Sequence, residues 1–140
     1  MGIGIGGARM AEKSKSYERG LAVRTAVLGK AHVDRSLGRM TEFDKDFQEL
    51  ITSYCWGEVW TRPGLERKTR SMLNLAMLAS LGREEEFKLH LRASRNTGVS
   101  RDEVKEVLLQ VAIYAGVPAA NSAFRMAREI FQELDKEAGK

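Results

Sequence analysis

The chain has 140 residues and a net charge of +4, and 43% of its residues are hydrophobic while 30% are charged. This length suits one domain, and this composition supplies both a packed core and a charged, soluble surface. The single cysteine, Cys55, excludes an intramolecular disulfide, a Cys-x-x-Cys redox pair and a cysteine zinc cluster. The two histidines, His32 and His90, are too few for a histidine-rich metal site, so we expect no bound metal.

Two further features exclude whole classes of partner. No apolar run approaches the ~18 residues of a membrane helix, and the glycine-rich start lacks the pattern of a signal peptide. We therefore expect a cytoplasmic protein with no membrane partner. Most of the excess basic charge lies before residue 40, and the remainder of the chain is close to neutral. Because a nucleic-acid-binding domain concentrates basic residues on a folded face, we expect no nucleic-acid partner.

The first half of the chain predicts two helices. Residues 1–14 begin with several glycines and offer no anchor, so we predict a disordered extension before a single domain over residues 15–140. A helix is expected over residues 17–28, ended by Gly29, with a buried stripe of Leu21, Ala22, Thr25 and Leu28. A loop over residues 30–37 and a helix over residues 41–55 follow, the latter capped by Thr41 with an apolar stripe of Phe43, Phe47, Leu50, Ile51 and Tyr54.

The second half predicts four more helices, over residues 66–81, 84–96, 101–115 and 119–136. The first of these is apolar nearly all round from Met72 onward, which is typical of a central helix buried on several sides. Ser100 and Glu103 form a capping box for the third, and Pro118 suits the first turn of the fourth. No β-alternation competes, so the predicted fold class is all-α, a compact bundle of about six helices. The surplus of apolar helix surface favours a homo-oligomer.

His90 is the first candidate for chemistry. It lies in the middle of a predicted helix at helical spacing from apolar neighbours, and Glu86 stands four residues earlier. At that spacing a carboxylate can reach one ring nitrogen and set the tautomer of the imidazole. A satisfied core histidine is the alternative interpretation.

The segment over residues 56–65 is the second candidate. It combines Trp56, Trp60, Glu58 and Arg62 within ten residues, and we predict it to be a loop. Aromatic walls and an arginine suit a flat anionic ligand. The alternative is a packed loop in which both tryptophans fill the core.

Three weaker candidates complete the set. Arg67, Arg70 and Asn74 share one face at the polar start of a helix, where an anion could bind, and Arg70 is favoured because it adjoins the apolar section. A solvated basic face is the alternative. His32 stands beside an aspartate and an arginine that could simply fix a loop. Tyr114 could offer a phenol to a pocket, although core packing competes with that role.

Taken together, these segments resemble the carboxymuconolactone decarboxylase family over about residues 17–134. The resemblance rests on segments spread along the chain, namely 27–29, 31–36, 47–49, 56–65, 69–71, 88–93, 106–109 and 118–121. It implies an alkylhydroperoxidase-like helical fold and a ring-shaped homo-oligomer, either a hexamer built as a trimer of dimers or a trimer. It also implies decarboxylation of 4-carboxymuconolactone, a dicarboxylate lactone, to β-ketoadipate enol-lactone and CO2 in the protocatechuate branch of the β-ketoadipate pathway.

The residues suit that reaction. Loss of CO2 leaves a charge that spreads through the ring to the lactone carbonyl, so the substrate is its own electron sink and we expect no cofactor. Arg62 and Arg70 would bind the dianion, with Trp56, His32 and Tyr114 as further substrate-binding candidates. The developing oxyanion would be stabilised by His90 or the Trp60 N–H. His90 is the best general acid, with Glu58 as the second candidate and Glu86 orienting the imidazole.

Two other interpretations remain open. Thiol-dependent relatives of the same fold use a Cys-x-x-Cys-x-x-x-His motif with an upstream glutamate. Here the histidine falls on His90, but the two cysteine positions fall on Arg83 and Glu86 and the glutamate position on Ser71. The chain could therefore be a thiol-independent member with a different small-acid substrate, or a non-catalytic helical interaction module.

Overall fold

A computed structural model describes residues 4–139, with side chains from residue 15 onward. Over these residues the chain forms seven α-helices and one π-helical segment, and it contains no strand. The predicted all-α class is therefore confirmed. The backbone divides into two compact units, unit 1 (Met1–Gly64) and unit 2 (Leu65–Lys140), and each is described by itself. The expected single domain over residues 15–140 stays a prediction.

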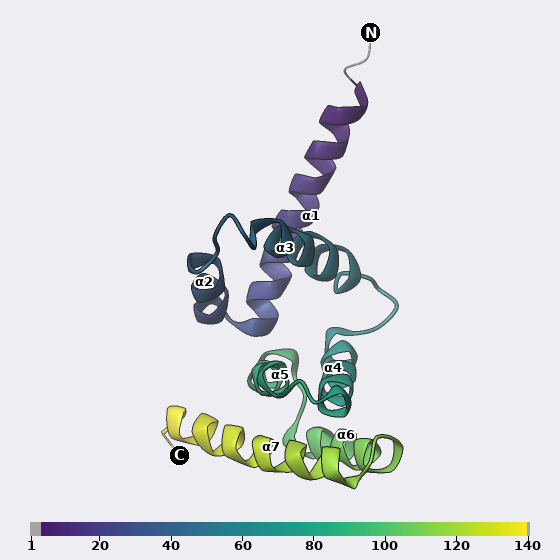
Figure 1. The fold of residues 1–140 in the computed structure, drawn as a ribbon, viewed down its shortest axis with the longest axis vertical. Coiled ribbons are helices and arrows are strands. Elements are labelled where there is room, and N and C mark those ends of the chain that lie inside the picture. The colour runs from purple at the N-terminus through teal and green to yellow at the C-terminus, as the bar shows by residue number, and fades with distance from the viewer. Residues whose placement is uncertain (1–3, 140) are drawn as a thin grey trace. The chain divides into compact units, whose positions relative to one another are not determined.

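Unit 1 contains α1 (Gly4–Leu28), α2 (Lys30–Gly38), α3 (Lys45–Leu50) and the π-helix η1 (Ile51–Val59) (Figure 1). Of the extension predicted to be disordered, residues 1–3 lie outside the described residues, whereas residues 4–14 are the start of α1. The helix continues there because strong helix formers fill residues 8–13. The first helix nevertheless ends at Leu28, as predicted.

Two predicted loops of unit 1 are helical. Residues 30–37 belong to α2, which starts directly after Gly29 because that residue adopts a φ of 92° and lets the chain change direction in one step. The buried side chain of Val33 then holds α2 against its unit. Residues 56–59 belong to η1, whose wide turns are shown by the bond from the Trp60 N–H to the carbonyl of Cys55, five residues earlier.

The helix predicted over residues 41–55 starts later than expected. The Asp44 carboxylate accepts bonds from the backbone N–H of Thr41 at 2.7 Å and from its hydroxyl at 3.0 Å. These bonds close a turn over residues 41–44, and α3 begins only at Lys45. The predicted apolar stripe is largely exposed in the described chain, at Phe43, Phe47, Leu50 and Tyr54.

Helices α1 and η1 cross at a very short distance because each contributes a glycine to the crossing. A Cβ atom on Gly20 would lie 1.8 Å from the carbonyl oxygen of Thr52, and one on Gly57 would lie 2.2 Å from that of Ser16. Neither position can carry a side chain unless the two backbones separate, because a packed interior leaves no room for the extra atoms.

This crossing also explains why the predicted buried stripe of α1 is wrong. The buried residues are Ser16, Gly20, Arg24 and Val27, whereas the predicted positions Leu21, Ala22, Thr25 and Leu28 are partly or fully exposed. The predicted residues and the buried residues both follow helical spacing, so the helix was predicted correctly but the wrong face of it was expected to be buried. Small and polar residues occupy the contact because the close backbones leave no space for leucine.

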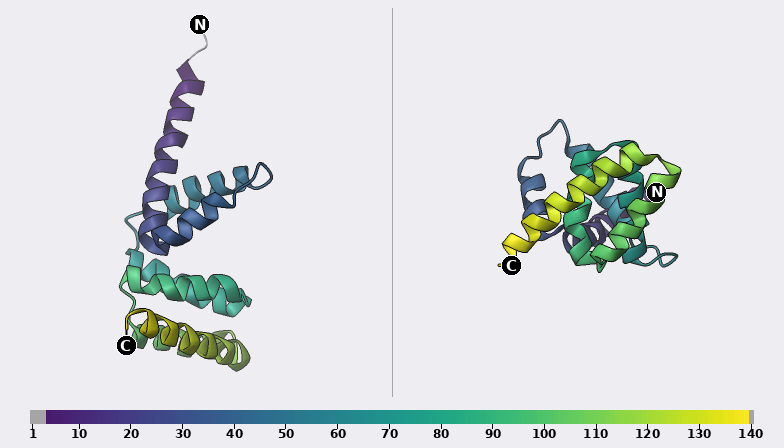
Figure 2. Two further views of the ribbon diagram at one scale, coloured as in Figure 1. Left: turned by 90° about the vertical axis from the view of Figure 1, so that its left-hand side faces the viewer. Right: turned by 90° about the horizontal axis from the view of Figure 1, so that it is seen from below.

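Unit 2 contains α4 (Arg67–Leu81), α5 (Glu84–Thr97), α6 (Arg101–Tyr114) and α7 (Val117–Glu137). Helices α4 and α5 form one layer, and α6 and α7 form the second (Figure 2). The layers enclose an apolar core that includes Leu75, Phe87, Leu91, Leu108 and Ile130. The capping box of Ser100 and Glu103 begins α6, as predicted, and Pro118 stands in the first turn of α7.

The prediction that α4 is buried on several sides is wrong for the described chain. Leu75 and Ala79 are buried in the core of unit 2, but Leu73, Met77 and Leu81 are exposed. The three exposed residues recur every fourth position, so they form one apolar stripe along the helix. The core therefore covers only one side of α4.

The glycine crossing gives a stability prediction. We expect Gly20→Ala to lower the free energy of unfolding by ~1–3 kcal/mol or more, because the added methyl group meets backbone atoms that cannot rotate away. Urea unfolding at a fixed protein concentration, followed by circular dichroism, measures the change. The matched control is Gly38→Ala, since no atom lies within 4 Å of the added Cβ there. Equal midpoints for the two variants would contradict the crossing.

Candidate active site

The predicted site residues fall in both units. Unit 1 carries Trp56 and Glu58 on η1, Trp60 and Arg62 directly after it, and His32 on α2. Unit 2 carries Arg70 on α4, Glu86 and His90 on α5, and Tyr114 at the end of α6. Each set is described within its own unit.

The two tryptophans pack inside unit 1. Trp56 and Trp60 are only 6% and 8% exposed, and their rings stack with centroids 4.8 Å apart and planes inclined by 25°. The Trp60 indole N–H donates to the thiol of Cys55. In the described chain this N–H therefore already has an acceptor, and the interpretation of the tryptophans as core residues is supported.

Glu58 is engaged by donors from α1. Its Oε1 accepts a bond from the hydroxyl of the buried Ser16 and another from Arg19, whose Nη2 lies 3.1 Å away. Both partners donate, so Glu58 acts as an acceptor that attaches η1 to α1. Arg62 lies beyond the end of η1 and is exposed.

His32 lies on a helix, not in the predicted loop. Its side chain is half-buried, and its pKa is lowered from the ordinary value by burial and by the positive charges of Arg24 and Arg35. Each of these effects penalises the protonated ring. The imidazole is therefore neutral at pH 7, and it can accept a hydrogen bond from a ligand or a proton.

Sequence reasoning missed Arg24, which is only 4% exposed. Its Nη1 donates to the Gln48 amide oxygen at 3.1 Å and to the Thr52 hydroxyl at 3.2 Å, and its Nη2 donates to the Ser36 hydroxyl at 3.0 Å. Burial lowers the pKa of the guanidinium. The spacing of Arg24 from Ser16 and Gly20 would have placed it on the small-residue face of α1, but a lone arginine on a helix is usually assigned to solvent.

In unit 2, His90 projects from the core-facing side of α5. The residue is half-buried and its Nδ1 atom is buried, while Phe87, Leu91 and Ser94 on the same side of the helix are buried. This confirms the predicted inward face. Glu86 is exposed one turn earlier on α5, so its proposed role in orienting the imidazole stays a prediction.

Arg70 stands on α4, the helix that packs against α5. It is half-buried with a buried Nε atom, whereas Arg67 is exposed, as the preference for Arg70 implied. The Thr97 hydroxyl donates to that of Ser71 at 2.9 Å, which fixes the register of these two antiparallel helices. From that register, His90 lies about two turns, or ~10 Å, from Arg70 along the helix pair. A small dicarboxylate can span this distance.

Tyr114 is 83% exposed at the end of α6. The alternative interpretation, in which its side chain packs in the core, is therefore wrong for the described chain.

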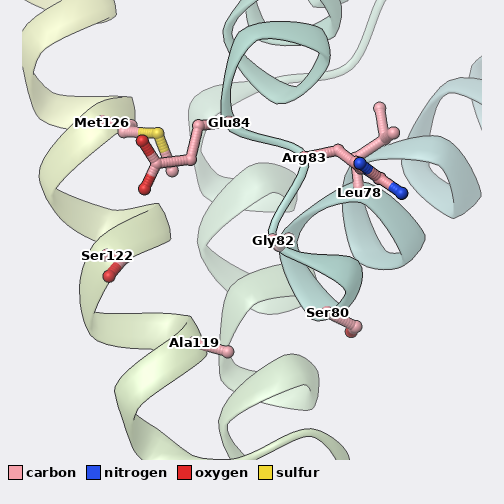
Figure 3. A pocket seen from close by; sticks show the side chains of 9 residues that line it. Leu78, Ser80, Gly82, Arg83, Glu84, Ala119, Ser122 and Met126 are labelled. Atoms are coloured by element: carbon pink, nitrogen blue, oxygen red, sulfur yellow. The ribbon is translucent and has the colours of Figure 1, made fainter.

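None of the predicted site residues lines the cavity of about 130 Å³ between the end of α4 and α7. Ala119, Ser122 and Met126 project from α7 toward this cavity, and Arg83 points away from α7 (Figure 3). The cavity is therefore distinct from the His90 face of α5.

Neither a metal-binding cluster nor a membrane-spanning helix occurs among the described residues. They hold no group of three or more His, Cys, Asp or Glu side chains arranged to bind a metal ion. No helix in the described part of the chain has the length and apolar character needed to cross a membrane.

Known proteins resemble this chain over most of its length. Residues 45–129 match the model of the carboxymuconolactone decarboxylase family. A 4-carboxymuconolactone decarboxylase of Acinetobacter baylyi is 53% identical over 84% of this chain and 88% of its own length. A nitrosuccinic acid decarboxylase of Metarhizium robertsii is 37% identical over 84% of this chain and 82% of its own length. A 4-carboxymuconolactone decarboxylase sequence of Pseudomonas putida is 49% identical over 34% of this chain and 98% of its own length.

The environment of Cys55 predicts that its thiol reacts slowly with alkylating reagents. Burial raises its pKa, although Arg24 and the Trp60 N–H act in the opposite direction. At pH 8 the thiolate fraction is therefore below that of an ordinary cysteine, and we expect iodoacetamide to alkylate the folded chain more slowly than the urea-unfolded chain. The difference should narrow as the pH rises, because both thiols then ionise. Equal rates at pH 8 would contradict the assigned environment.

Proposed function

This chain belongs to the carboxymuconolactone decarboxylase family, and from that membership we propose that it converts 4-carboxymuconolactone to β-ketoadipate enol-lactone and CO2. The observation that carries the proposal is the 53% identity to a 4-carboxymuconolactone decarboxylase over most of both chains. The placement of His90 on an inward face, beside the helix that carries Arg70, supports it. The reaction belongs to the protocatechuate branch of the β-ketoadipate pathway, and we propose a cytoplasmic location.

The reaction needs a site for a dianion and a donor for one proton. The bond between the ring carbon and the departing carboxylate breaks, and its electron pair moves through the ring to the lactone carbonyl oxygen. A proton then adds to the carbon next to that carbonyl. Because the substrate itself accepts the electron pair, we propose that the enzyme uses no cofactor.

His90 is the best proton donor among the candidates. It lies on a regular helix whose neighbouring residues include buried ones, so the backbone that carries it is held in a defined position. Glu58, the second candidate, accepts hydrogen bonds from Ser16 and Arg19 in unit 1. It therefore acts there as a hydrogen-bond acceptor and is less suited to donate a proton. We therefore assign the proton transfer to His90, which regains its proton from water after each turnover.

The remaining roles follow from charge and geometry. We propose that Arg70 binds one end of the dianion, and the exposed Arg62 of unit 1 stays a candidate cation for substrate binding. His90 also stabilises the oxyanion, a role for which Trp60 is less suited because its indole N–H donates to Cys55. We retain Trp56 as an aromatic wall and Tyr114 as an exposed phenol that a ligand can contact.

A second substrate class is favoured by one observation, the 37% identity to a nitrosuccinic acid decarboxylase. Nitrosuccinic acid is also a dicarboxylate, and a nitro group can accept the electron pair left by CO2 as the lactone carbonyl does. Comparison of kcat/KM for the two substrates on one preparation decides between them. We expect the lactone to be preferred, because the identity to the lactone decarboxylase is higher.

We also propose that the chain forms a homo-oligomer, either a hexamer built as a trimer of dimers or a trimer. Apolar side chains are exposed in a stripe on α4 and on the last turns of α6, at Leu73, Met77, Leu81, Leu109 and Ile113. A face of this kind is typical of an association surface. Sedimentation equilibrium at micromolar concentration tests the proposal, and the 15.7 kDa mass of a single chain would contradict it.

Steady-state kinetics test the assigned roles. Wild-type chain treated with EDTA should release CO2 from 4-carboxymuconolactone. We expect His90→Gln to lower kcat by about 10²–10⁴-fold, because glutamine cannot supply the proton. Arg70→Ala should mainly raise KM, because its charge pairing exists in both the ground state and the transition state.

Circular dichroism must show that both variants fold, and Cys55→Ser is the matched control because its thiol has no role in the reaction. A folded His90→Gln variant that keeps more than about a tenth of the wild-type kcat would exclude His90 as the acid. Absence of CO2 release by the wild type would contradict the proposed function itself.

A further inference from the structure

Asn74 lies on the flank of α4 that borders α5. Helix α4 buries one row of residues in the core of unit 2, namely Ser71, Leu75 and Ala79. On one side of that row Lys68 pairs with Glu103 of α6 at 2.8 Å, so this flank of α4 borders α6. Asn74 lies on the other side of the row, four residues after Arg70, and both residues are half-buried. Their flank therefore borders α5, the helix beside α4 in the same layer (Figure 2).

His90 lies on the matching flank of α5. Thr97, seven residues later and on the same side of that helix, donates its hydroxyl to Ser71 of α4 at 2.9 Å. Another side of α5 borders α7, because Arg92 pairs with Glu137 there at 3.2 Å. The imidazole of α5 and the amide of α4 therefore project from facing flanks of one helix pair, and both belong to unit 2.

The register of this pair places Asn74 between Arg70 and His90. The bond between Thr97 and Ser71 sets position 74 beside position 94 of the antiparallel α5. Asn74 is one turn from Arg70 along α4, and His90 is one turn from position 94 along α5, so each step is ~5 Å along the helix axes. The side chains thus follow one another in the order cation, amide, imidazole.

The amide of Asn74 is available to a ligand. It takes part in no hydrogen bond with another described side chain or backbone group, and its polar atoms are not sealed from solvent. A carboxamide carries two N–H donors and no charge. It can therefore donate to an oxygen atom of a bound substrate without adding a further cation to the site.

We propose that Asn74 is a further catalytic residue, which donates an N–H to the lactone carbonyl oxygen and stabilises the negative charge that forms there as CO2 leaves. This proposal rests on the proposed decarboxylation of 4-carboxymuconolactone. A donor directed at this oxygen gains strength as the electron pair of the broken bond moves there, so it stabilises the transition state more than the ground state.

The order of atoms in the substrate matches the order of the side chains. Around the lactone ring, the carbonyl carbon is bonded to the carbon that receives the proton. On its other side the ring oxygen links it to the carbon that carries the departing carboxylate. His90 at the protonated carbon, Asn74 at the carbonyl and Arg70 at the carboxylate end follow the same sequence.

Steady-state kinetics with Asn74→Leu test this role. Leucine has a similar volume but no donor, so we expect kcat to fall by about 10²–10³-fold while KM changes by less than about threefold. Thr69→Val replaces another half-buried polar group on a different side of α4, so it is the matched control and should keep the wild-type kcat. An Asn74→Leu variant that is folded by circular dichroism and keeps more than about a tenth of the wild-type kcat would overturn the proposal.

Infrared spectroscopy distinguishes a bond to the carbonyl from a merely structural role. The probe is muconolactone, which is the substrate without its departing carboxylate, isotopically labelled at the lactone carbonyl carbon. A donated hydrogen bond weakens the carbonyl bond, so the stretching frequency of the bound probe should be lower on the wild type and on Thr69→Val than on Asn74→Leu. Equal frequencies on all three proteins, or failure of the wild type to bind muconolactone, would overturn the proposal.

If Asn74→Leu does not fold, Asn74→Asp decides, because aspartate keeps the shape of asparagine and replaces the N–H donors with an acceptor. We expect the same rise in carbonyl frequency and at least the same loss of kcat. An Asn74→Asp variant that matches the wild type in either measurement would overturn the proposal.

Release of CO2 from 4-carboxymuconolactone, measured on the same wild-type preparation, keeps the two proposals separate. A chain that releases CO2 but shows no dependence of the carbonyl frequency on Asn74 retains the reaction and loses this donor. A chain that shows the dependence but releases no CO2 retains the lactone site and loses the proposed reaction.

Discussion

The guanidinium of Arg24 bonds to one residue on each of α2, α3 and η1 from its own position on α1. Unit 1 is therefore organised around a buried charged group in addition to its buried tryptophans and valines. The arrangement requires α1 and η1 to lie close together, and the glycines at positions 20 and 57 make that approach possible. The stacked tryptophans of η1 and the Glu58 contacts with α1 depend on the same crossing.

Unit 2 is built on a different principle. Its two layers share an apolar core, and ion pairs join the outer surfaces of α5 and α7, where Arg92 contacts Glu133 and Glu137. Exposed pairs of this kind add little stability one at a time, so the core fixes the position of α5. His90 thus projects from a helix whose neighbouring side chains are immobilised by packing. A proton donor needs this kind of support, because small displacements reduce proton transfer sharply.

Much of the fold could be predicted because local signals agree with the tertiary structure. Gly82 and Gly98 end α4 and α5 with positive φ values, and the Ser100 capping box starts α6. The inward face of His90 also follows from helical spacing. The family resemblance, which rested on segments spread along the chain, is confirmed by the match over residues 45–129.

The wrong predictions in unit 1 share a physical cause. Apolar periodicity predicts helices that bury leucine and valine, but α1 buries serine, glycine and arginine beside a single valine, so the prediction of its buried face is wrong. The same rule gave no signal for α2, which buries Val33 alone. Apolar periodicity has no pattern that indicates a π-helix, so the sequence predicts a loop where residues 56–59 belong to η1. Arg24 was missed because its burial depends on contacts with three other elements.

The central claim is that His90 delivers a proton to a defined face of the intermediate after CO2 has left. Turnover of 4-carboxymuconolactone in D2O, stopped early and examined by proton NMR with a chiral solvating agent, measures the configuration at the newly deuterated carbon, which is the one stereocentre of the product. The account predicts a single enantiomer from the wild type, because a fixed acid reaches one face only. A racemic product from the wild type would show that water supplies the proton at random, and would contradict the assignment of His90.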